Sequence, residues 1–161
     1  MAVLTAAVAV LAIPAAAGAR PTANDKAEAE MLDAINGVRK ENGLYPLRSS
    51  KSLNDSAGRY SHWLMANDTF AHQSSIQASS RFSMLGEALA MHTSLRFGVR
   101  STIRQWMNSP PHRALVLTSV MRWFGTGATR GRFGASDATT WVLHLGKLEP
   151  PRPTLPSLPL P

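Results

Sequence analysis

The chain has 161 residues, of which 44% are hydrophobic, and its 17 Lys and Arg against 10 Asp and Glu give a formal net charge of +7. This length suits one domain with a hydrophobic core, and the composition excludes general disorder. The chain has no cysteine, so disulfides, thiolate metal sites and cysteine nucleophiles are excluded.

Residues 1–17 are almost wholly apolar and are followed by small residues typical of a signal-peptidase site. The basic n-region of a signal peptide is missing, so either Met1 is not the true start or the segment is a weak signal. Pro14 interrupts this segment, which disfavours a stable membrane span. We therefore predict a signal peptide over residues 1–19, with a retained N-terminal anchor as the alternative. The mature protein is expected to be secreted or held at the cell envelope, outside the cytoplasm.

Apolar residues recur at helical spacing in the first two thirds of the remaining chain. Helices are expected over residues 26–41, 50–66 and 97–107, with one further turn at 114–117. Asp25 and Glu28 have the spacing of a capping box at the start of the first helix.

The segment between the second and third helices is rich in Ser and Gln. Residues 73–83 are expected to form a loop, with one helical turn near 81–85. Residues 87–91 form a short apolar segment around the acid Glu87. No strand is predicted in this part of the sequence.

Two strands are expected near the C-terminus, at residues 123–130 and 139–145, joined by a glycine-rich loop at 131–137. Alternation in the second strand divides its side chains between two faces. One face carries Trp141, Leu143 and Leu145, and the other carries Thr140, Val142 and His144.

The domain is expected to span residues 20–149. From residue 150 the composition changes, because residues 150–161 hold six of the 11 prolines of the chain. A segment of this kind forms neither a helix nor a strand ladder, and we predict that it is extended or disordered.

The sequence Trp-Met-Asn-Ser-Pro-Pro-His-Arg ends the third predicted helix. The two prolines stop the helix and stiffen the backbone directly before His112. Two upstream residues, His72 and Glu87, are candidates to face it. Two imidazoles can bind a divalent transition metal at an open site, and an acid beside them can orient a ring or move a proton. Each of the three alone has an ordinary structural explanation.

The order Phe-x-His, Gly-Glu-x-Leu-Ala and Trp-Met-Asn-Ser-Pro-x-His-Arg, followed by a Gly-x-Gly strand and a Trp-Val strand, resembles the bacterial, cysteine-free branch of the CAP superfamily. This superfamily, also called SCP, comprises cysteine-rich secretory proteins, antigen 5 and pathogenesis-related 1. The resemblance covers roughly residues 27–146. It implies an α+β fold, an α-β-α sandwich with a small antiparallel sheet between helical layers.

The resemblance also implies a central cavity with two His and two Glu, which binds divalent metal in some members. His72 and His112 match the two histidines, and Glu87 matches one acid. The position of the other acid is Ser109 here, which is a much poorer metal ligand. Any divalent ion such as zinc is therefore expected to bind weakly, through His72 and His112, and in a pH-dependent way.

Two further departures from the family pattern remove hydrogen-bonding groups near the cleft. Ala88 and Leu115 stand where an asparagine is usual. The rim of the cleft is expected to include Ser109, His92 and His144.

Standard catalytic signatures are absent from the sequence. The residues and the resemblance together favour a secreted, monomeric CAP domain whose His/Glu-lined cleft binds a small ligand, such as a lipid or a cell-wall fragment, or an envelope component. The alternative is a metal-dependent, peptidase-like hydrolase that uses His72, Glu87 and His112. No run of five basic residues occurs, so no nucleic-acid partner is expected, and the positive charge favours attraction to an anionic envelope.

Overall fold

The computed structural model describes residues 22–150. The predicted leader at residues 1–19 and the proline-rich segment from residue 151 onward lie outside the described residues. In chain order the elements are α1 (Ala23–Glu41), β1 (Arg48–Ser49), α2 (Lys51–Ala66), β2 (Phe82–His92), α3 (Val99–Asn108), α4 (Pro110–Val116), β3 (Trp123–Phe133) and β4 (Ser136–Leu148). No helix between residues 22 and 150 is long and apolar enough to cross a bilayer.

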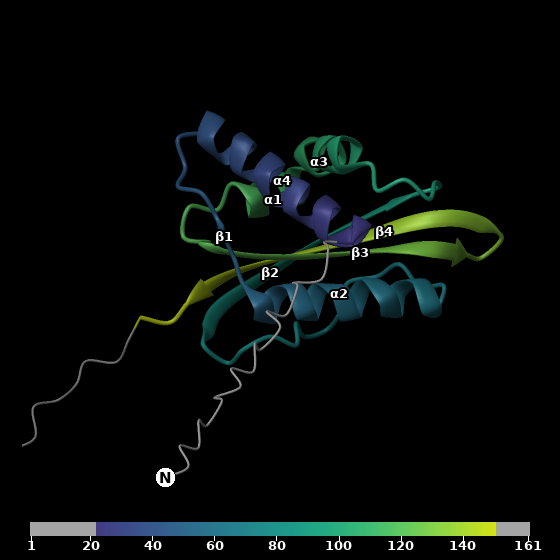
Figure 1. Ribbon diagram of the computed structural model, residues 1–161. Coiled ribbons are helices and arrows are strands. Elements are labelled where there is room, and N and C mark those ends of the chain that lie inside the picture. Colours follow the sequence, from purple (N-terminus) through teal and green to yellow (C-terminus); the bar gives the residue numbers. More distant parts are fainter. Residues whose placement is uncertain (1–21, 151–161) are drawn as a thin grey trace, which may run out of the picture.

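The strands form one sheet in the order β1-β3-β4-β2. Helix α2 covers one face of this sheet, and α1, α3 and α4 cover the other (Figure 1). The predicted α-β-α sandwich is therefore confirmed. The sheet is mixed and not purely antiparallel, because the short strand β1 runs parallel to β3.

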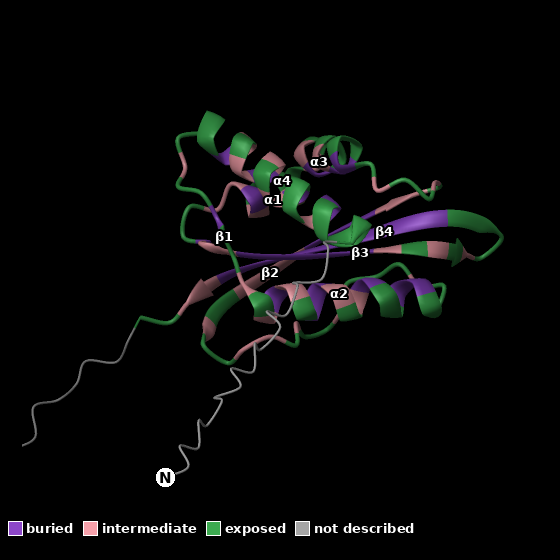
Figure 2. Ribbon diagram, in the orientation of Figure 1, coloured by how far each residue is buried: buried purple, intermediate pink, exposed green. Residues whose placement is uncertain are grey.

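Alternating side chains of β4 separate the two cores, as the sequence predicted. Trp141, Leu143 and Leu145 lie in the larger core, beneath α1, α3 and α4. Val142 lies in the smaller core beneath α2, with Leu64. Figure 2 shows that the buried residues line the faces between the layers.

The helices differ from expectation mainly at their ends. Helix α1 begins at Ala23, because Thr22 caps it and exchanges hydrogen bonds with Asp25 in a reciprocal capping box. This pair replaces the predicted pair of Asp25 and Glu28. Pro110 and Pro111 end α3 and also occupy the first turn of α4, where a missing backbone N–H costs nothing. The single turn predicted at 114–117 is therefore part of a longer helix.

Strand β2 is the main element that the sequence did not predict. The expected helical turn at 81–85 is part of this strand, which lies at an edge of the sheet and pairs with β4 along its length. The predicted glycine-rich loop at 131–137 is also mostly strand, because β3 and β4 pair as far as Phe133 and Ser136. The turn between them contains Gly134 at a φ of 55°, which favours glycine.

Two features fix the helical layers on the sheet. A Cβ at Gly125 or Gly127 would meet the backbone of α2, so these glycines let the helix lie directly on β3. On the other face, the buried guanidinium of Arg39 donates hydrogen bonds to four carbonyls. These carbonyls belong to Tyr45, Val116, Thr118 and Met121, so Arg39 ties α1 to the end of α4 and to the entry of β3.

Candidate functional site

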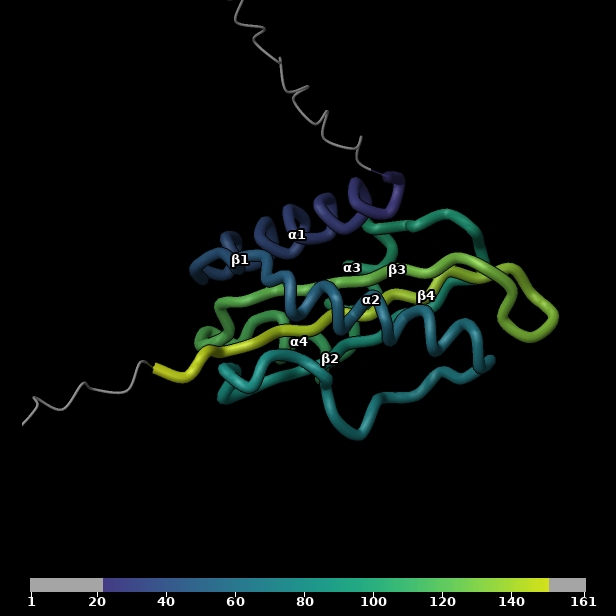
Figure 3. Tube along the Cα trace, turned by 60° about the horizontal axis from the view of Figure 1, so that its bottom comes forward, coloured from purple at the N-terminus to yellow at the C-terminus, as the bar shows by residue number. Residues whose placement is uncertain are grey.

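Three residues distant in the sequence lie together at the edge of the sheet. Glu87 is in the middle of the edge strand β2, His72 lies in the loop that follows α2, and His112 is in the first turn of α4. The rings of His72 and His112 have centroids 6.4 Å apart and planes inclined by 57°. The loop after α2 and helix α4 belong to layers on opposite faces of the sheet, so the group spans its edge. Figure 3 shows that the backbone of both segments passes near β2.

Both carboxylate oxygens of Glu87 are engaged. Oε1 lies 2.7 Å from His72 Nδ1 and accepts from the backbone N–H of Gln73 at 3.3 Å. Oε2 accepts from Gln73 Nε2 at 2.6 Å and lies 3.0 Å from His144 Nε2. The side chain of Glu87 is only 6% exposed, so these partners replace nearly all of its water.

These contacts keep Glu87 ionised. Burial acts to raise the pKa of Glu87, but hydrogen bonds from His144, Gln73 and His72, with the charge of His144, hold the pKa below its ordinary value. A buried carboxylate of this kind orients its partners strongly, because its hydrogen bonds are charge-assisted.

His144 is part of this network and lies deeper than a cleft rim, since it is fully buried. Its Nε2 is within hydrogen-bond distance of both Glu87 and Gln73, at 3.0 and 2.9 Å. A nitrogen that donates to Glu87 cannot also accept from Gln73, so only one of these contacts is a hydrogen bond at a time. Glu87 and His144 are direct neighbours in the sheet, which explains why they share a face.

The two remaining imidazoles differ in environment. The side chain of His72 is 58% exposed, and because Nδ1 faces Glu87, its Nε2 is the nitrogen left for a ligand. His112 is half-buried, and its Nδ1 is buried without a partner among the described residues. Burial, and secondarily the charge of His72, lower the pKa of His112, so it stays neutral at neutral pH.

Contact between Leu115 of α4 and Gly86 of β2 places His112 close to the edge strand. A Cβ at Gly86 would collide with the side chain of Leu115, so the glycine lets α4 approach β2 next to Glu87. Ala88 points to the other side of the strand, into the larger core. Ala88 and Leu115, which stand where the family pattern has an asparagine, are therefore used for packing.

Helix α2 holds the loop that carries His72. The hydroxyl of Tyr60 donates to the carbonyl of Ala71 at 2.7 Å. The guanidinium of Arg59 donates to the carbonyl of Gln77 at 3.1 Å. These bonds fix both ends of the segment that faces Glu87.

Two of the predicted rim residues do not join the group. His92 Nε2 lies 2.8 Å from the hydroxyl of Thr102 in α3, on the face of the sheet opposite to Glu87. Odd spacing along β2 places residues 87 and 92 on opposite faces, so alternation excludes His92. Ser109 lies between α3 and α4, and its side chain makes no hydrogen bond within the described part of the chain.

A pocket of about 510 Å³ opens beside Glu87. It lies between the loop after α2 and the first half of β2, and its lining is mostly polar. The lining residues are His72, Gln73, Ser74, Ser75, Ile76, Leu85, Gly86 and Glu87.

The residues at this pocket do not fit a tightly held metal ion. Within residues 22–150, no three His, Cys, Asp or Glu side chains gather in a way that could hold a metal. The oxygens of Glu87 are already engaged, and Ser109 supplies no carboxylate. Only the imidazoles of His72 and His112 remain, whereas catalytic zinc sites have three protein ligands.

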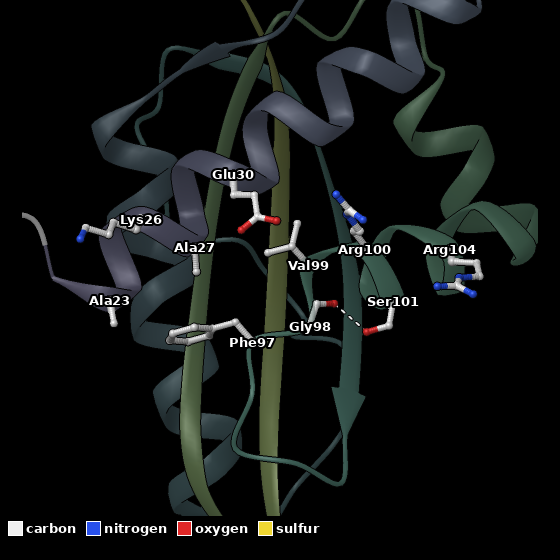
Figure 4. Close-up of a pocket in the computed structure, with 10 residues that line it drawn as sticks. All are labelled: Ala23, Lys26, Ala27, Glu30, Phe97, Gly98, Val99, Arg100, Ser101 and Arg104. Atoms are coloured by element: carbon white, nitrogen blue, oxygen red, sulfur yellow. Dashed lines mark hydrogen bonds between the residues drawn. The ribbon is translucent and has the colours of Figure 1, made fainter.

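A second pocket, of about 600 Å³, lies between α1 and α3 (Figure 4). Phe97 and Val99 give it an apolar floor, and Arg100 and Arg104 lie along α3 beside it. None of the predicted site residues lines this pocket. We regard the pocket beside Glu87 as the candidate site, because two predicted site residues, His72 and Glu87, line it and belong to one hydrogen-bonded network.

Gln73 is the member of the network that the sequence analysis missed. Its amide contacts both Glu87 and His144, and its backbone N–H contacts Glu87 as well. The one signal in the sequence was its place directly after His72. His144 was proposed from strand alternation, but only the pairing of β2 with β4 places it beside Glu87.

The sequence matches the model of the cysteine-rich secretory protein family (CAP) over residues 32–145. No curated protein matches the chain by sequence. Solved structures with a similar fold include an outer surface protein of Borrelia burgdorferi, with a TM-score of 0.62 and 20% identity over 75% of this chain and 92% of that chain.

Two other solved structures have a similar fold. An extracellular protein of Bacillus anthracis that contains an SCP domain has a TM-score of 0.62 and 18% identity, over 77% of this chain and 41% of that chain. Venom allergen-like protein 4 of Schistosoma mansoni has a TM-score of 0.60 and 11% identity, over 78% and 90%. At these identities the likeness shows the fold alone.

Proposed function

Because the chain belongs to the cysteine-rich secretory protein (CAP) family, we propose that it is a ligand-binding domain that works at or outside the cell envelope. The pocket beside Glu87 is its binding site. The observation that carries this proposal is the fixed position of Glu87 between His72 and His144, at the wall of an open polar pocket. A network that orders side chains around a pocket prepares it for a ligand.

The chemistry of the pocket favours a small polar ligand. Gln73, Ser74 and Ser75 line it with amide and hydroxyl groups, and His72 offers Nε2. A fragment of a cell-wall polymer, which carries hydroxyls and amides, matches these groups. In this proposal a divalent ion is at most a weak additional ligand of the two imidazoles.

An amphipathic ligand, such as a lipid, fits the second pocket better. Phe97 and Val99 provide apolar contact there, and Arg100 and Arg104 provide positive charge at its side (Figure 4). The two kinds of ligand proposed from the sequence therefore suit different pockets of the same domain.

Localisation outside the cytoplasm is proposed on two grounds. The apolar start of the sequence has the features of a signal peptide. Some solved structures with this fold are described as extracellular or outer surface proteins. N-terminal sequencing of the protein from culture medium and from washed cells tests this point, and a chain that still begins at Met1 in the cytosol would contradict it.

The alternative function is a hydrolase. The contact between His72 and Glu87 is the geometry that orients a general base, which favours this possibility. However, no Ser or Thr hydroxyl hydrogen-bonds to His72 or His112 within residues 22–150, so the nucleophile would have to be water. Turnover of peptide and ester libraries that disappears in His112→Ala would establish the hydrolase and replace binding as the function.

The binding proposal is tested by native mass spectrometry of protein from its own host, followed by titration with purified cell-wall fragments. We expect a retained or titratable ligand whose affinity falls about tenfold, or about 1.4 kcal/mol, in Glu87→Gln, because the charge-assisted bonds that hold His72 and Gln73 at the pocket are lost. Glu41→Gln, at the exposed end of α1, is the matched control and should bind as wild type. If no fragment binds, or if both variants lose binding equally, the proposal fails.

A further inference from the structure

The outer surface of α2 carries an exposed aromatic ring whose position is fixed. Within residues 22–150, α2 is alone on its face of the sheet, so its outer side is uncovered (Figures 1 and 2). Trp63 on this helix is 47% exposed, whereas Trp106 and Trp141 are buried. The ring of Tyr60 stacks on Trp63 with centroids 5.6 Å apart and planes inclined by only 8°.

Tyr60 is itself held in place, because its hydroxyl donates to the carbonyl of Ala71. The indole of Trp63 therefore rests on a ring that is anchored to the loop after α2. A large side chain that is ordered and still half exposed contributes less to folding than a buried one. Ordered, exposed tryptophan is characteristic of binding surfaces.

The charge next to Trp63 is positive and not neutralised. Arg59 lies one helical turn before Trp63 on the same side of α2. Its guanidinium bonds to a carbonyl, that of Gln77, and it makes no ion pair among the residues the structure describes. The nearby acids have other partners, since Asp55 pairs with Lys51 and Asp68 accepts from the backbone of Gly134.

A flat ring next to a guanidinium that has no ion-pair partner among the described residues favours one class of ligand. The apolar face of a sugar ring stacks on an indole, and a carboxylate pairs with arginine in a charge-assisted contact. We propose that the outer face of α2, formed by Arg59, Tyr60, His62 and Trp63, binds an acidic polysaccharide, with a sugar ring on Trp63 and its carboxylate on Arg59.

Other occupants match this surface less well. A single-stranded nucleic acid would also stack on Trp63, but it carries a phosphate at every residue and requires a track of cations that this helix lacks. The net charge of +7 brings an anionic polymer to the protein at long range. No residue of this surface lines the pocket beside Glu87, although Tyr60 and Arg59 bond to the loop that does, so this proposal does not rest on the proposed function.

Affinity electrophoresis through gels that contain polygalacturonate tests the proposal with the full protein. We expect wild type to be retarded at low salt, and neutral dextran to retard it at least about tenfold less. Trp63→Ala should weaken binding about tenfold, which corresponds to about 1.4 kcal/mol, and Trp63→Phe should keep most of it. Arg59→Gln should weaken binding roughly threefold at low salt and reduce its salt dependence.

The matched control is Tyr45→Ala, which removes another aromatic ring, 72% exposed and outside α2, and should leave binding unchanged. Glu87→Gln should also leave it unchanged, which separates this surface from the pocket. The proposal is overturned if wild type does not bind polygalacturonate, if Trp63→Ala binds like Tyr45→Ala, if Glu87→Gln abolishes binding, or if a thymidine oligonucleotide binds more tightly than the polysaccharide.

Discussion

The ring centroids of His72 and His112 lie 6.4 Å apart, although the loop after α2 and helix α4, which carry them, belong to layers on opposite faces of the sheet. They meet because β2 is an edge strand, so side chains from both layers can reach around it. Glu87, in the middle of this strand, contacts His72 directly. The edge of the sheet is thus where the two layers share one group of polar residues.

Zinc is expected to bind only weakly to these two imidazoles. With two protein ligands, the dissociation constant at pH 7.5 should be on the order of 0.1–1 mM, and binding should be weaker at pH 5.5, because a protonated imidazole does not coordinate metal. Calorimetry with wild type, His72→Ala and His112→Ala measures this. His62→Ala, an exposed histidine of α2, is the control. Binding below about 1 µM would show that further ligands join the site.

Removal of the Glu87 charge should make the free energy of unfolding less dependent on pH in the acidic range. The pKa of Glu87 is below its ordinary value of 4.5 in the folded protein, so its contribution is present above pH 4.5 and is lost as the pH falls through the folded pKa. Glu87→Gln should lower the free energy of unfolding by about 1–3 kcal/mol at pH 7 and by less at acidic pH. Urea unfolding at several pH values checks this, with Glu41→Gln as the control.

Glu28 should behave in the opposite way. Burial, and then the charge of Asp25, raise the pKa of Glu28 to about 7, against the lowering effect of a backbone hydrogen bond with Ala128. Its stabilising contribution is therefore present below pH 4.5 and is lost as the pH rises toward 7. Thermal unfolding at pH 5 and 8 should show Glu28→Gln gaining about 1 kcal/mol over wild type at the higher pH, allowing for its partial exposure. An equal gain in Glu30→Gln would contradict the assignment to Glu28.

Substitution of Arg39 should be strongly destabilising. In Arg39→Met the hydrocarbon part is kept, but four carbonyl acceptors lose their charged donor inside the protein. The free energy of unfolding should fall by about 3–5 kcal/mol. Lys40→Met, at the exposed neighbouring position, should change it by less than about 0.5 kcal/mol. A small effect of Arg39→Met would mean that water replaces the guanidinium.

Two glycine substitutions should have opposite effects. Gly127→Ala places a methyl group against the backbone of α2 at Ala57 and Gly58, so it should cost about 2–3 kcal/mol as the helix is pushed away. Gly37→Ala has open space around its Cβ and lies within α1, so it should stabilise by about 0.5–1 kcal/mol. Chemical denaturation of both variants measures the difference, and equal effects would exclude close packing of α2 on β3 as the cause.

The sequence predicted the helices and the two long strands because their apolar residues repeat clearly. Strand β2 was not predicted, because Met84, Leu85, Ala88 and Leu89 follow the i, i+1, i+4, i+5 spacing of a helix and do not alternate as in a strand. This segment becomes a strand through its pairing with β4, which is a tertiary interaction.

The geometry of the candidate site also depends on tertiary interactions that the sequence alone does not reveal. His72, Glu87 and His112 were selected through a family resemblance, and their own spacing contains no information about distance in space. Alternation in β4 correctly grouped His144 with Val142, yet the direct contact of His144 with Glu87 depends on the register of β2. Gln73 lies in a loop whose path is set by Tyr60 and Arg59, which no local pattern reveals.

His72 and His112 are attached to different helical layers, so the distance between their rings depends on the position of one layer relative to the other. A small sliding of α4, or of the loop held by α2, would change the gap between the rings, while Glu87 stays with the sheet. The NMR resonances of these two imidazoles would therefore report a displacement of α4 or of this loop. The pair is a suitable position for a spectroscopic reporter, because its separation changes when the layers move and neither ring lies in a hydrophobic core.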